Sequence, residues 1–311
     1  MRIVKPKALG RGDVIGIAAP ASPPASEEML SKGIRYLERL GYRVELGSHI
    51  YHKRGYLAGT DEERVSDLHE LFANPKVKAI FTVRGGYGAM RLLPLLDLSL
   101  IRRNPKILVG YSDITVLQLA LFNALGLVTF SGPMVAVEMA EGIRGEAEEQ
   151  FWKCITSSDP PGSIKIMARR RKIYRTGTAT GRILGGNLSM IAALIGSAYV
   201  PTTVNHILIL EEVAEKPYRI DRMLQQLGGT PLLGKAKGVV LGSFTDCAPS
   251  PGGNSLSLDQ VFQDAFKQYR FPVMGSVRYG HERYSLTIPL GVKVRMDAGR
   301  GELTFLESGV S

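Results

Sequence analysis

Ser112 has a residue type and a position that suit a nucleophile. The apolar residues 107–109 predict a buried strand, residues 110–112 a tight turn, and the residues from Asp113 onward a helix. Amides in a first helical turn lack intrahelical partners, and the helix dipole favours negative charge there. Many α/β hydrolases place a catalytic serine on such an elbow, although Ile114 replaces the trailing glycine of Gly-x-Ser-x-Gly here. The alternative is that Ser112 only caps the helix.

Two further groups could take part in chemistry with this serine. Four apolar residues, 207–210, are followed by Glu211 and Glu212, so a buried strand ends in carboxylates. His281 lies in a polar turn downstream of them. Taken singly, each has an ordinary interpretation: a strand that emerges into solvent, and a surface histidine. No histidine has a partner at the spacing typical of metal ligands.

The composition allows several kinds of partner. The 311 residues carry a formal net charge of +10, which attracts nucleic acid, anionic membrane or acidic small substrates alike. The basic residues are dispersed except for the cluster at 169–172, which falls in a Pro/Gly/Ser/Thr-rich stretch and favours a solvated linker over a nucleic-acid site. Cys154 and Cys247 lack the spacing of zinc ligands and are expected to be structural thiols.

The elements that must position these residues alternate in type along the first half. Strands are predicted at 13–20, 43–46, 77–83 and 107–109, with helices at 26–40 and from a capping box at Thr60–Glu63 onward. This alternation predicts an α/β fold with a parallel, doubly wound sheet. Ligands collect at the carboxyl ends of such strands. The glycine loop 84–88 and the turn at Ser112 both follow strands and should face one crevice.

The second half mixes strands with fewer helices, so its sheet should not be wholly parallel. A glycine turn and short helix are expected over 181–195. We expect an amino-terminal domain over 1–160, a linker over 161–177 and a carboxy-terminal domain over 178–311. The sequence shows no apolar run of signal-peptide or membrane-spanning length, so we expect a cytoplasmic protein.

Five ordered motifs resemble those of a known family. They are Arg84-Gly-Gly-Tyr-Gly88, Val109-Gly-Tyr-Ser-Asp-Ile-Thr115, Gly185-Gly-Asn187, Leu210-Glu-Glu212 with Tyr218-Arg-Ile-Asp-Arg222, and Gly280-His281 with Leu286-Thr-Ile-Pro-Leu-Gly291. Together they resemble the LD-carboxypeptidases, also called muramoyltetrapeptide carboxypeptidases, which are serine peptidases. The resemblance runs from residue 13 to about residue 297, and five motifs in order are far more specific than any one of them.

The resemblance assigns roles to three residues. It implies that Ser112 is the nucleophile, Glu211 the acidic member of the triad and His281 the base. It also implies a Rossmann-like amino-terminal domain, a smaller β-rich swivelling carboxy-terminal domain, a site between them and a homodimer. The family often has aspartate where Glu212 stands in this sequence. The chemistry agrees, since a serine needs a base oriented by a carboxylate and the order Ser, acid, His occurs in α/β hydrolases.

The expected reaction is hydrolysis of the L,D-peptide bond that holds the terminal D-alanine of a murein tetrapeptide. The backbone amides of Gly86 and Asp113 are the candidates for the oxyanion hole. Arg84, Arg278 or Arg283 could clamp the terminal carboxylate, with ordinary surface ion pairing as the alternative for each. We expect no cofactor and no metal, and neither nucleic acid nor membrane as a partner.

Two other functions fit parts of the pattern. A microcin-immunity hydrolase of the same family would use the same triad on an aminoacyl nucleotide. Its adenine site would need an aromatic platform, and Trp152, the single tryptophan, falls in a predicted helix where core packing is its simpler role. A non-catalytic protein whose two lobes close on an anion would explain the charge and the glycine loops. Such a binding protein would not explain why a carboxylate and a histidine should also lie at the crevice.

Overall fold

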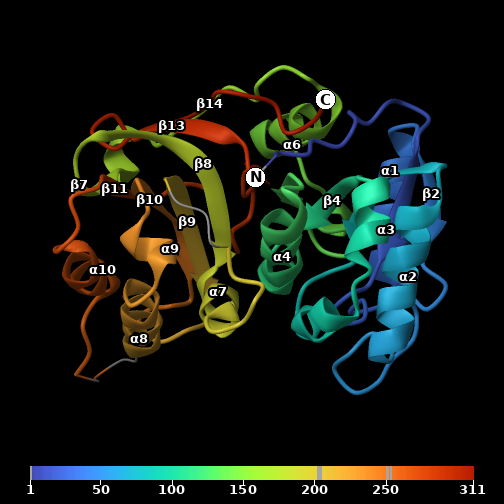
Figure 1. The fold of residues 1–311 in the computed structure, drawn as a ribbon, viewed down its shortest axis with the longest axis horizontal. Helices are drawn as coiled ribbons and strands as arrows, with labels where there is room; N and C mark the ends of the chain where they lie inside the picture. The colour runs from blue at the N-terminus through green and yellow to red at the C-terminus, as the bar shows by residue number, and fades with distance from the viewer. Residues whose placement is uncertain (1, 202–204, 250–251, 253) are drawn as a thin grey trace.

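The computed structural model describes residues 2–201, 205–249, 252 and 254–311, and it folds as two α/β domains that lie side by side (Figure 1). The first sheet has six strands in the order β12-β5-β4-β3-β1-β2. Five of them are parallel and β12 is antiparallel to β5. The strands are β1 (Val14–Ala18), β2 (Arg43–Leu46), β3 (Val77–Thr82), β4 (Ile107–Gly110), β5 (Thr129–Ser131) and β12 (Ile288–Leu290).

Local sequence signals account for most of this first domain. Strands β1 to β4 lie where the apolar runs predict them, while β5 was not predicted. The capping box is present, because the Thr60 hydroxyl accepts from the Glu63 amide and the Glu63 carboxylate accepts from the Thr60 amide. The helices are α1 (Glu27–Arg39), α2 (Asp61–Ala73), α3 (Leu98–Arg103), α4 (Thr115–Leu125), α5 (Glu138–Glu141) and α6 (Glu146–Thr156), with 3₁₀ turns η1 (Ala89–Leu95) and η2 (Ser112–Ile114).

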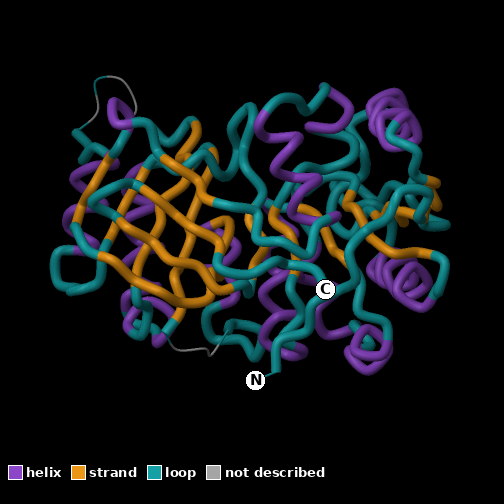
Figure 2. The backbone as a smooth tube through the Cα atoms, turned by 90° about the horizontal axis from the view of Figure 1, so that it is seen from above, coloured by secondary structure: helices purple, strands orange, loops and turns teal. Residues whose placement is uncertain are grey.

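The second sheet is mixed, as the sequence predicts. Its eight strands follow the order β6-β14-β13-β8-β9-β10-β11-β7, and only β8 to β11 run parallel. They are β6 (Ser163–Lys165), β7 (Lys172–Arg175), β8 (Thr178–Asn187), β9 (His206–Val213), β10 (Gly238–Thr245), β11 (Val273–Gly275), β13 (Lys293–Asp297) and β14 (Glu302–Phe305). Helices α7 (Leu188–Leu194), α8 (Pro217–Gly228), α9 (Pro231–Gly234) and α10 (Leu258–Phe266), with η3 (Ala168–Arg170), complete the domain. In Figure 2 the strands of this domain lie together on one side of the molecule, next to the helix-rich first domain.

Two segments differ from their predictions. Residues 161–177, expected as a linker, contain η3 and the edge strands β6 and β7 of the second sheet. Residues 181–187, expected as a glycine turn, belong to the ten-residue strand β8. The glycines permit close contact, because a Cβ on Gly185 would lie 1.9 Å from the Ile209 carbonyl oxygen of the neighbouring strand.

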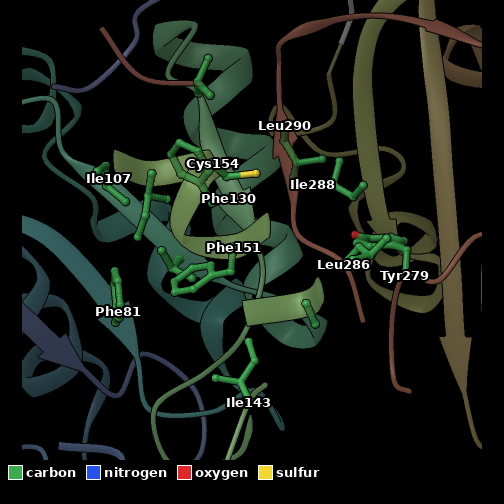
Figure 3. Close-up of a cluster of buried hydrophobic side chains, with 14 of the residues drawn as sticks. Phe81, Ile107, Phe130, Ile143, Phe151, Cys154, Tyr279, Leu286, Ile288 and Leu290 are labelled. Atoms are coloured by element: carbon green, nitrogen blue, oxygen red, sulfur yellow. The ribbon is translucent and has the colours of Figure 1, made fainter. Parts of the chain in front are cut away.

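Both hydrophobic clusters of the core contain residues of the two domains. Figure 3 shows one of them, in which Phe81, Phe130 and Phe151 of the first domain belong to the same cluster as Leu286 and Ile288, which follow the last strand of the second domain's parallel core. Strand β12 then pairs with β5 and extends the first sheet. The chain segment between β11 and β12 is therefore fixed in a different sheet at each end.

No helix in the described ranges is long and apolar enough to cross a membrane. Among the same residues, no three His, Cys, Asp or Glu side chains are grouped to hold a metal ion.

Candidate active site

Ser112 lies at the carboxyl end of β4, as expected, but it begins η2 rather than the long helix. Its φ of 63° is in the left-handed region, which a residue with a Cβ rarely adopts. Strain of this kind clusters at functional sites because the surrounding structure must hold it in place. The conformation sets Ser112 between the strand and the start of α4, as on a nucleophile elbow.

The three residues assigned by resemblance form one hydrogen-bonded line. The Nε2 atom of His281 lies 3.1 Å from the Ser112 Oγ, and its Nδ1 lies 2.7 Å from Glu211 Oε2. Glu211 is 1% exposed, whereas the His281 ring keeps about a fifth of its surface exposed. A serine hydroxyl next to an imidazole that a buried carboxylate orients is the arrangement that makes serine a nucleophile.

Glu211 and Glu212 have different partners although they are adjacent. In strand β9 successive side chains point to opposite faces. Glu211 faces His281, while Glu212 accepts hydrogen bonds from Asn187 Nδ2 at 2.9 Å and from the Ser189 amide at 2.8 Å. Glu212 thus holds the start of α7, where the Asn187 side chain is the N-cap. The geometry assigns the contact with the base to Glu211.

Two glycines permit the close contacts around this line. A Cβ on Gly280 would lie 2.6 Å from Glu211 Oε2, so only glycine lets the Gly-His turn pass this carboxylate. A Cβ on Gly85 would lie 2.9 Å from the Ser112 Cβ and 3.0 Å from its Oγ. Sequence analysis selected Gly86 and missed Gly85, although the paired glycines were the available signal.

The backbone amide that follows Ser112 lies close to the glycine loop. The position that a Gly85 Cβ would occupy lies 3.3 Å from the Asp113 amide nitrogen, so no side chain separates that amide from the 85–86 peptide. The Asp113 side chain points elsewhere and accepts from the Ala89 amide at 2.8 Å. Burial raises the pKa of this carboxyl to about 6. Only the backbone of Asp113 is therefore placed to serve an oxyanion.

The electrostatics around His281 favour its protonated form. Burial alone would lower the pKa of the imidazole, but the hydrogen bond and charge of Glu211, with the charges of Glu212 and Glu138, raise it above the ordinary 6.5. An imidazolium formed during a proton transfer would therefore be stabilised. The second oxygen of Glu211, Oε1, is buried and has no hydrogen-bond partner among the described residues.

A cavity of about 380 Å³ opens on the His281 side of the site. Tyr111, Tyr279 and Tyr284 line it together with Glu138, Glu141, Glu282 and Arg283. Tyr284 has a φ of 99°, a second strained position, and the guanidinium groups of Arg283 and Arg144 lie 5.3 Å and 5.9 Å from the centre of its ring. The sequence analysis did not select these tyrosines.

The three predicted arginines have different surroundings. Arg283 lines the cavity beside His281. Arg278 is held by the Glu146 carboxylate at 2.6 Å and by the Tyr284 carbonyl at 2.8 Å. Arg84 lies outside the lining of the cavity, and its Nε is buried without a hydrogen-bond partner in the described part of the chain. Arg283 is thus the one of the three that is free to meet a ligand in this cavity.

Direct contacts between the domains hold the site together. The Thr115 Oγ1 accepts from the Asn187 amide at 3.1 Å, and a Cβ on Gly186 would lie 2.5 Å from the same oxygen. The hydroxyls of Ser131 and Tyr279 lie 2.8 Å apart and are buried. These contacts lie next to the nucleophile and next to the base, so the packing of the domains is coupled to the geometry of the site.

Comparison with known proteins agrees with the motifs. Residues 15–132 match the LD-carboxypeptidase N-terminal domain, and residues 180–296 match the LD-carboxypeptidase C-terminal domain. The chain is 37% identical over 308 residues to a probable murein peptide carboxypeptidase of Bacillus subtilis, which covers 99% of this chain and 95% of that protein.

Solved structures have the same fold. A muramoyltetrapeptide carboxypeptidase from Oxalobacter formigenes superposes with a TM-score of 0.84 at 31% identity, over 94% of this chain and 97% of that one. The microcin C7 self-immunity protein MccF superposes with a TM-score of 0.90 at 25% identity, over 99% and 100% of the two chains. In Escherichia coli, MccF is 29% identical to this chain over 335 residues, with 97% and 96% covered. The chain described here belongs to the LD-carboxypeptidase family.

Proposed function

We propose that this protein is a serine carboxypeptidase that releases the terminal D-alanine from murein tetrapeptides by cleaving the L,D-peptide bond. The observation that carries the proposal is the hydrogen-bonded line from Glu211 through His281 to Ser112 beside a cavity. The similarity to murein peptide carboxypeptidases supports the choice of substrate.

In this mechanism Ser112 attacks the carbonyl that joins the diaminopimelate residue to D-alanine. His281 takes the hydroxyl proton and then gives it to the departing amine, while Glu211 holds the ring in one tautomer and stabilises the imidazolium. The amides of Gly86 and Asp113 donate to the oxyanion, and each such donor is typically worth about 3 kcal/mol in the transition state. Water then attacks the acyl-enzyme, with His281 again as the base.

The position of the cavity indicates where the leaving group lies. The group that accepts the proton from His281 must be close to that imidazole, and the cavity is lined by His281 itself. The departing D-alanine would therefore occupy the cavity, with Arg283 available for its carboxylate. Planar guanidinium groups bind carboxylates through two parallel hydrogen bonds.

The test is to incubate the purified protein with murein tetrapeptide and to follow the products by mass spectrometry. The proposal predicts the loss of one alanine and no other cleavage. Pentapeptide serves as the matched control, because its last bond joins two D-residues. Release from the pentapeptide alone would contradict the proposed specificity.

One observation favours a second substrate class. The cavity is much larger than a single alanine needs, and Tyr284 with its two flanking arginines could pack against a planar, anionic leaving group. The fold similarity to MccF points the same way. The expected aromatic platform is not Trp152, which stacks on Tyr42 at 5.0 Å within the first domain. Hydrolysis of an aminoacyl sulfamoyl adenosine, with the tetrapeptide left intact, would establish this activity instead.

The proposed enzyme would act as a homodimer in cytoplasmic recycling of peptidoglycan. Light scattering of the purified protein tests the dimer, and cell fractionation tests the location.

The same incubation distinguishes the enzyme from a non-catalytic anion-binding protein, because a binding protein would bind the tetrapeptide without consuming it.

A further inference from the structure

We propose that Tyr111 and Glu138 form a positioning pair that holds the His281 imidazole toward Ser112. The inference rests on the proposed function, because it concerns the base of the same reaction. Neither residue takes part in the chemistry described above, and both line the cavity.

Tyr111 connects the base to the backbone of the nucleophile. Its ring packs against the His281 ring with 4.9 Å between centroids and a tilt of 61°. Tyr111 directly precedes Ser112 and has an extended backbone, with φ −150°. Because the two residues are covalently linked, a ring that contacts His281 restricts the imidazole relative to Ser112, independently of the bond to Glu211.

Glu138 in turn fixes the tyrosine. The Tyr111 hydroxyl donates to Glu138 Oε1 at 2.6 Å, and the Met134 amide donates to Glu138 Oε2 at 2.9 Å. Both carboxylate oxygens therefore have a donor. Burial raises the pKa of Glu138, whereas these two hydrogen bonds oppose the rise because they favour the ionised form. The tyrosine cannot turn without losing its short hydrogen bond to Glu138.

Three carboxyl groups and one aromatic ring act on His281. Glu211, Glu212 and Glu138 all favour the protonated form of the imidazole, and the Tyr111 ring packs against it. Glu211 accepts from the imidazole directly, and Glu212 is occupied by Asn187 and Ser189. Neither Glu212 nor Glu138 has a hydrogen bond to the imidazole, and Glu138 is the one of the two that holds Tyr111, whose ring contacts His281.

The chain offers a matched control in another part of the first domain. The Tyr36 hydroxyl donates to Glu148 Oε1 at 2.7 Å, joining α1 to α6. Glu148→Gln alters the same kind of hydrogen bond without touching His281, and Tyr36→Phe removes it together with the hydrogen bond that the Tyr36 hydroxyl accepts from Trp152 Nε1 at 2.9 Å. They report what the loss of a tyrosine–glutamate pair does to folding alone.

The experiment measures kcat and kcat/KM against pH for the wild type, Glu138→Gln, Tyr111→Phe and the two control variants. Glu138 is among the carboxyl groups that raise the pKa of His281, so in Glu138→Gln the acid limb of kcat/KM should move to lower pH, by about 0.3–1 unit. Tyr111→Phe should lower the plateau kcat about 10-fold with little change in KM. The control variants should leave both quantities unchanged.

An NMR titration of the His281 ring, assigned with His281→Asn, gives a readout that needs no substrate. The proposal predicts a lower His281 pKa in Glu138→Gln than in the wild type. A plateau kcat of Tyr111→Phe equal to that of Tyr36→Phe would overturn the positioning role, and an unchanged titration would overturn the part assigned to Glu138. If the wild type leaves the tetrapeptide intact while the titration still shifts, the proposed substrate fails and the positioning pair does not.

Discussion

The His281 Nε2 lies 3.1 Å from the Ser112 Oγ, although 169 positions separate the two residues. Ser112 follows β4 of the first sheet, whereas His281 lies in the segment that leaves β11 of the second sheet and enters β12 of the first. The base is therefore carried by a connection that is fixed in both sheets. The distance between base and nucleophile depends on how the two domains pack.

The adjacent carboxylates provide a matched pair of variants. Glu211→Gln should lower kcat about 10⁴-fold, the loss that an amide at the acid position causes in a serine triad, with a small effect on stability. Glu212→Gln should keep most of the activity but lose an acceptor for Asn187 or Ser189, at a cost of about 1–3 kcal/mol in the free energy of unfolding. Kinetics and chemical denaturation of both variants check this. Equal losses of activity would contradict the assignment of the acid.

The pH dependence follows from the raised pKa of His281. The base must be neutral to accept the proton, so kcat/KM should fall below an apparent pKa that lies above 6.5. The free energy of unfolding depends on pH in the opposite direction. Protonation of His281 stabilises the folded chain below pH 6.5, and this contribution is lost as the pH rises through the pKa that His281 has in the folded chain. Comparing the unfolding free energy of the wild type and His281→Asn across this range measures it. An acid limb below pH 6 would contradict the account.

Gly85 should be intolerant of a side chain. Gly85→Ala would place a Cβ 2.9 Å from the Ser112 Cβ, so the nucleophile or the glycine loop must shift. We expect kcat to fall about 100-fold, the scale of loss that follows a small misplacement of a reacting group. Gly234→Ala is the control, because its Cβ would meet nothing within 4 Å. Similar kcat values for the two variants would show that close packing at Ser112 is unimportant.

Arg283 and Arg278 should differ in their effect on substrate recognition. Arg283→Ala should raise KM about 10-fold or more for a tetrapeptide with a free carboxyl terminus. It should leave the KM of the carboxy-terminal amide unchanged, if that analogue is cleaved. Arg278→Ala should affect both substrates alike, because its guanidinium already contacts Glu146 and the Tyr284 carbonyl. An equal rise in KM for the acid and the amide in Arg283→Ala would exclude the clamp.

Local patterns predicted the elements of the first domain well. Strand β2 lies at the predicted residues 43–46, and the capping box at Thr60 begins α2. These signals depend on near neighbours in the sequence, so they can be interpreted without the fold. The resemblance supplied the residues that meet at the site, which a periodic pattern could not do.

Other features depend on contacts between distant segments. The edge strand β6 has only three residues and β7 buries none of its four, so neither gives a pattern long enough to predict a strand in this stretch. Strand β12 has three residues, and only its pairing with β5 places it in the first sheet. The contacts of Tyr111 with Glu138 and His281 also join distant positions, which explains why sequence analysis missed them.

The central claim is that the Ser112 hydroxyl attacks the bond that holds the terminal D-alanine. The most direct measurement compares D-alanine release from murein tetrapeptide by the wild type and by Ser112→Ala at equal concentrations. The account predicts release of one D-alanine per peptide by the wild type, and a loss of at least about 10⁴-fold in kcat for the variant. Release by Ser112→Ala at a rate close to that of the wild type would contradict it.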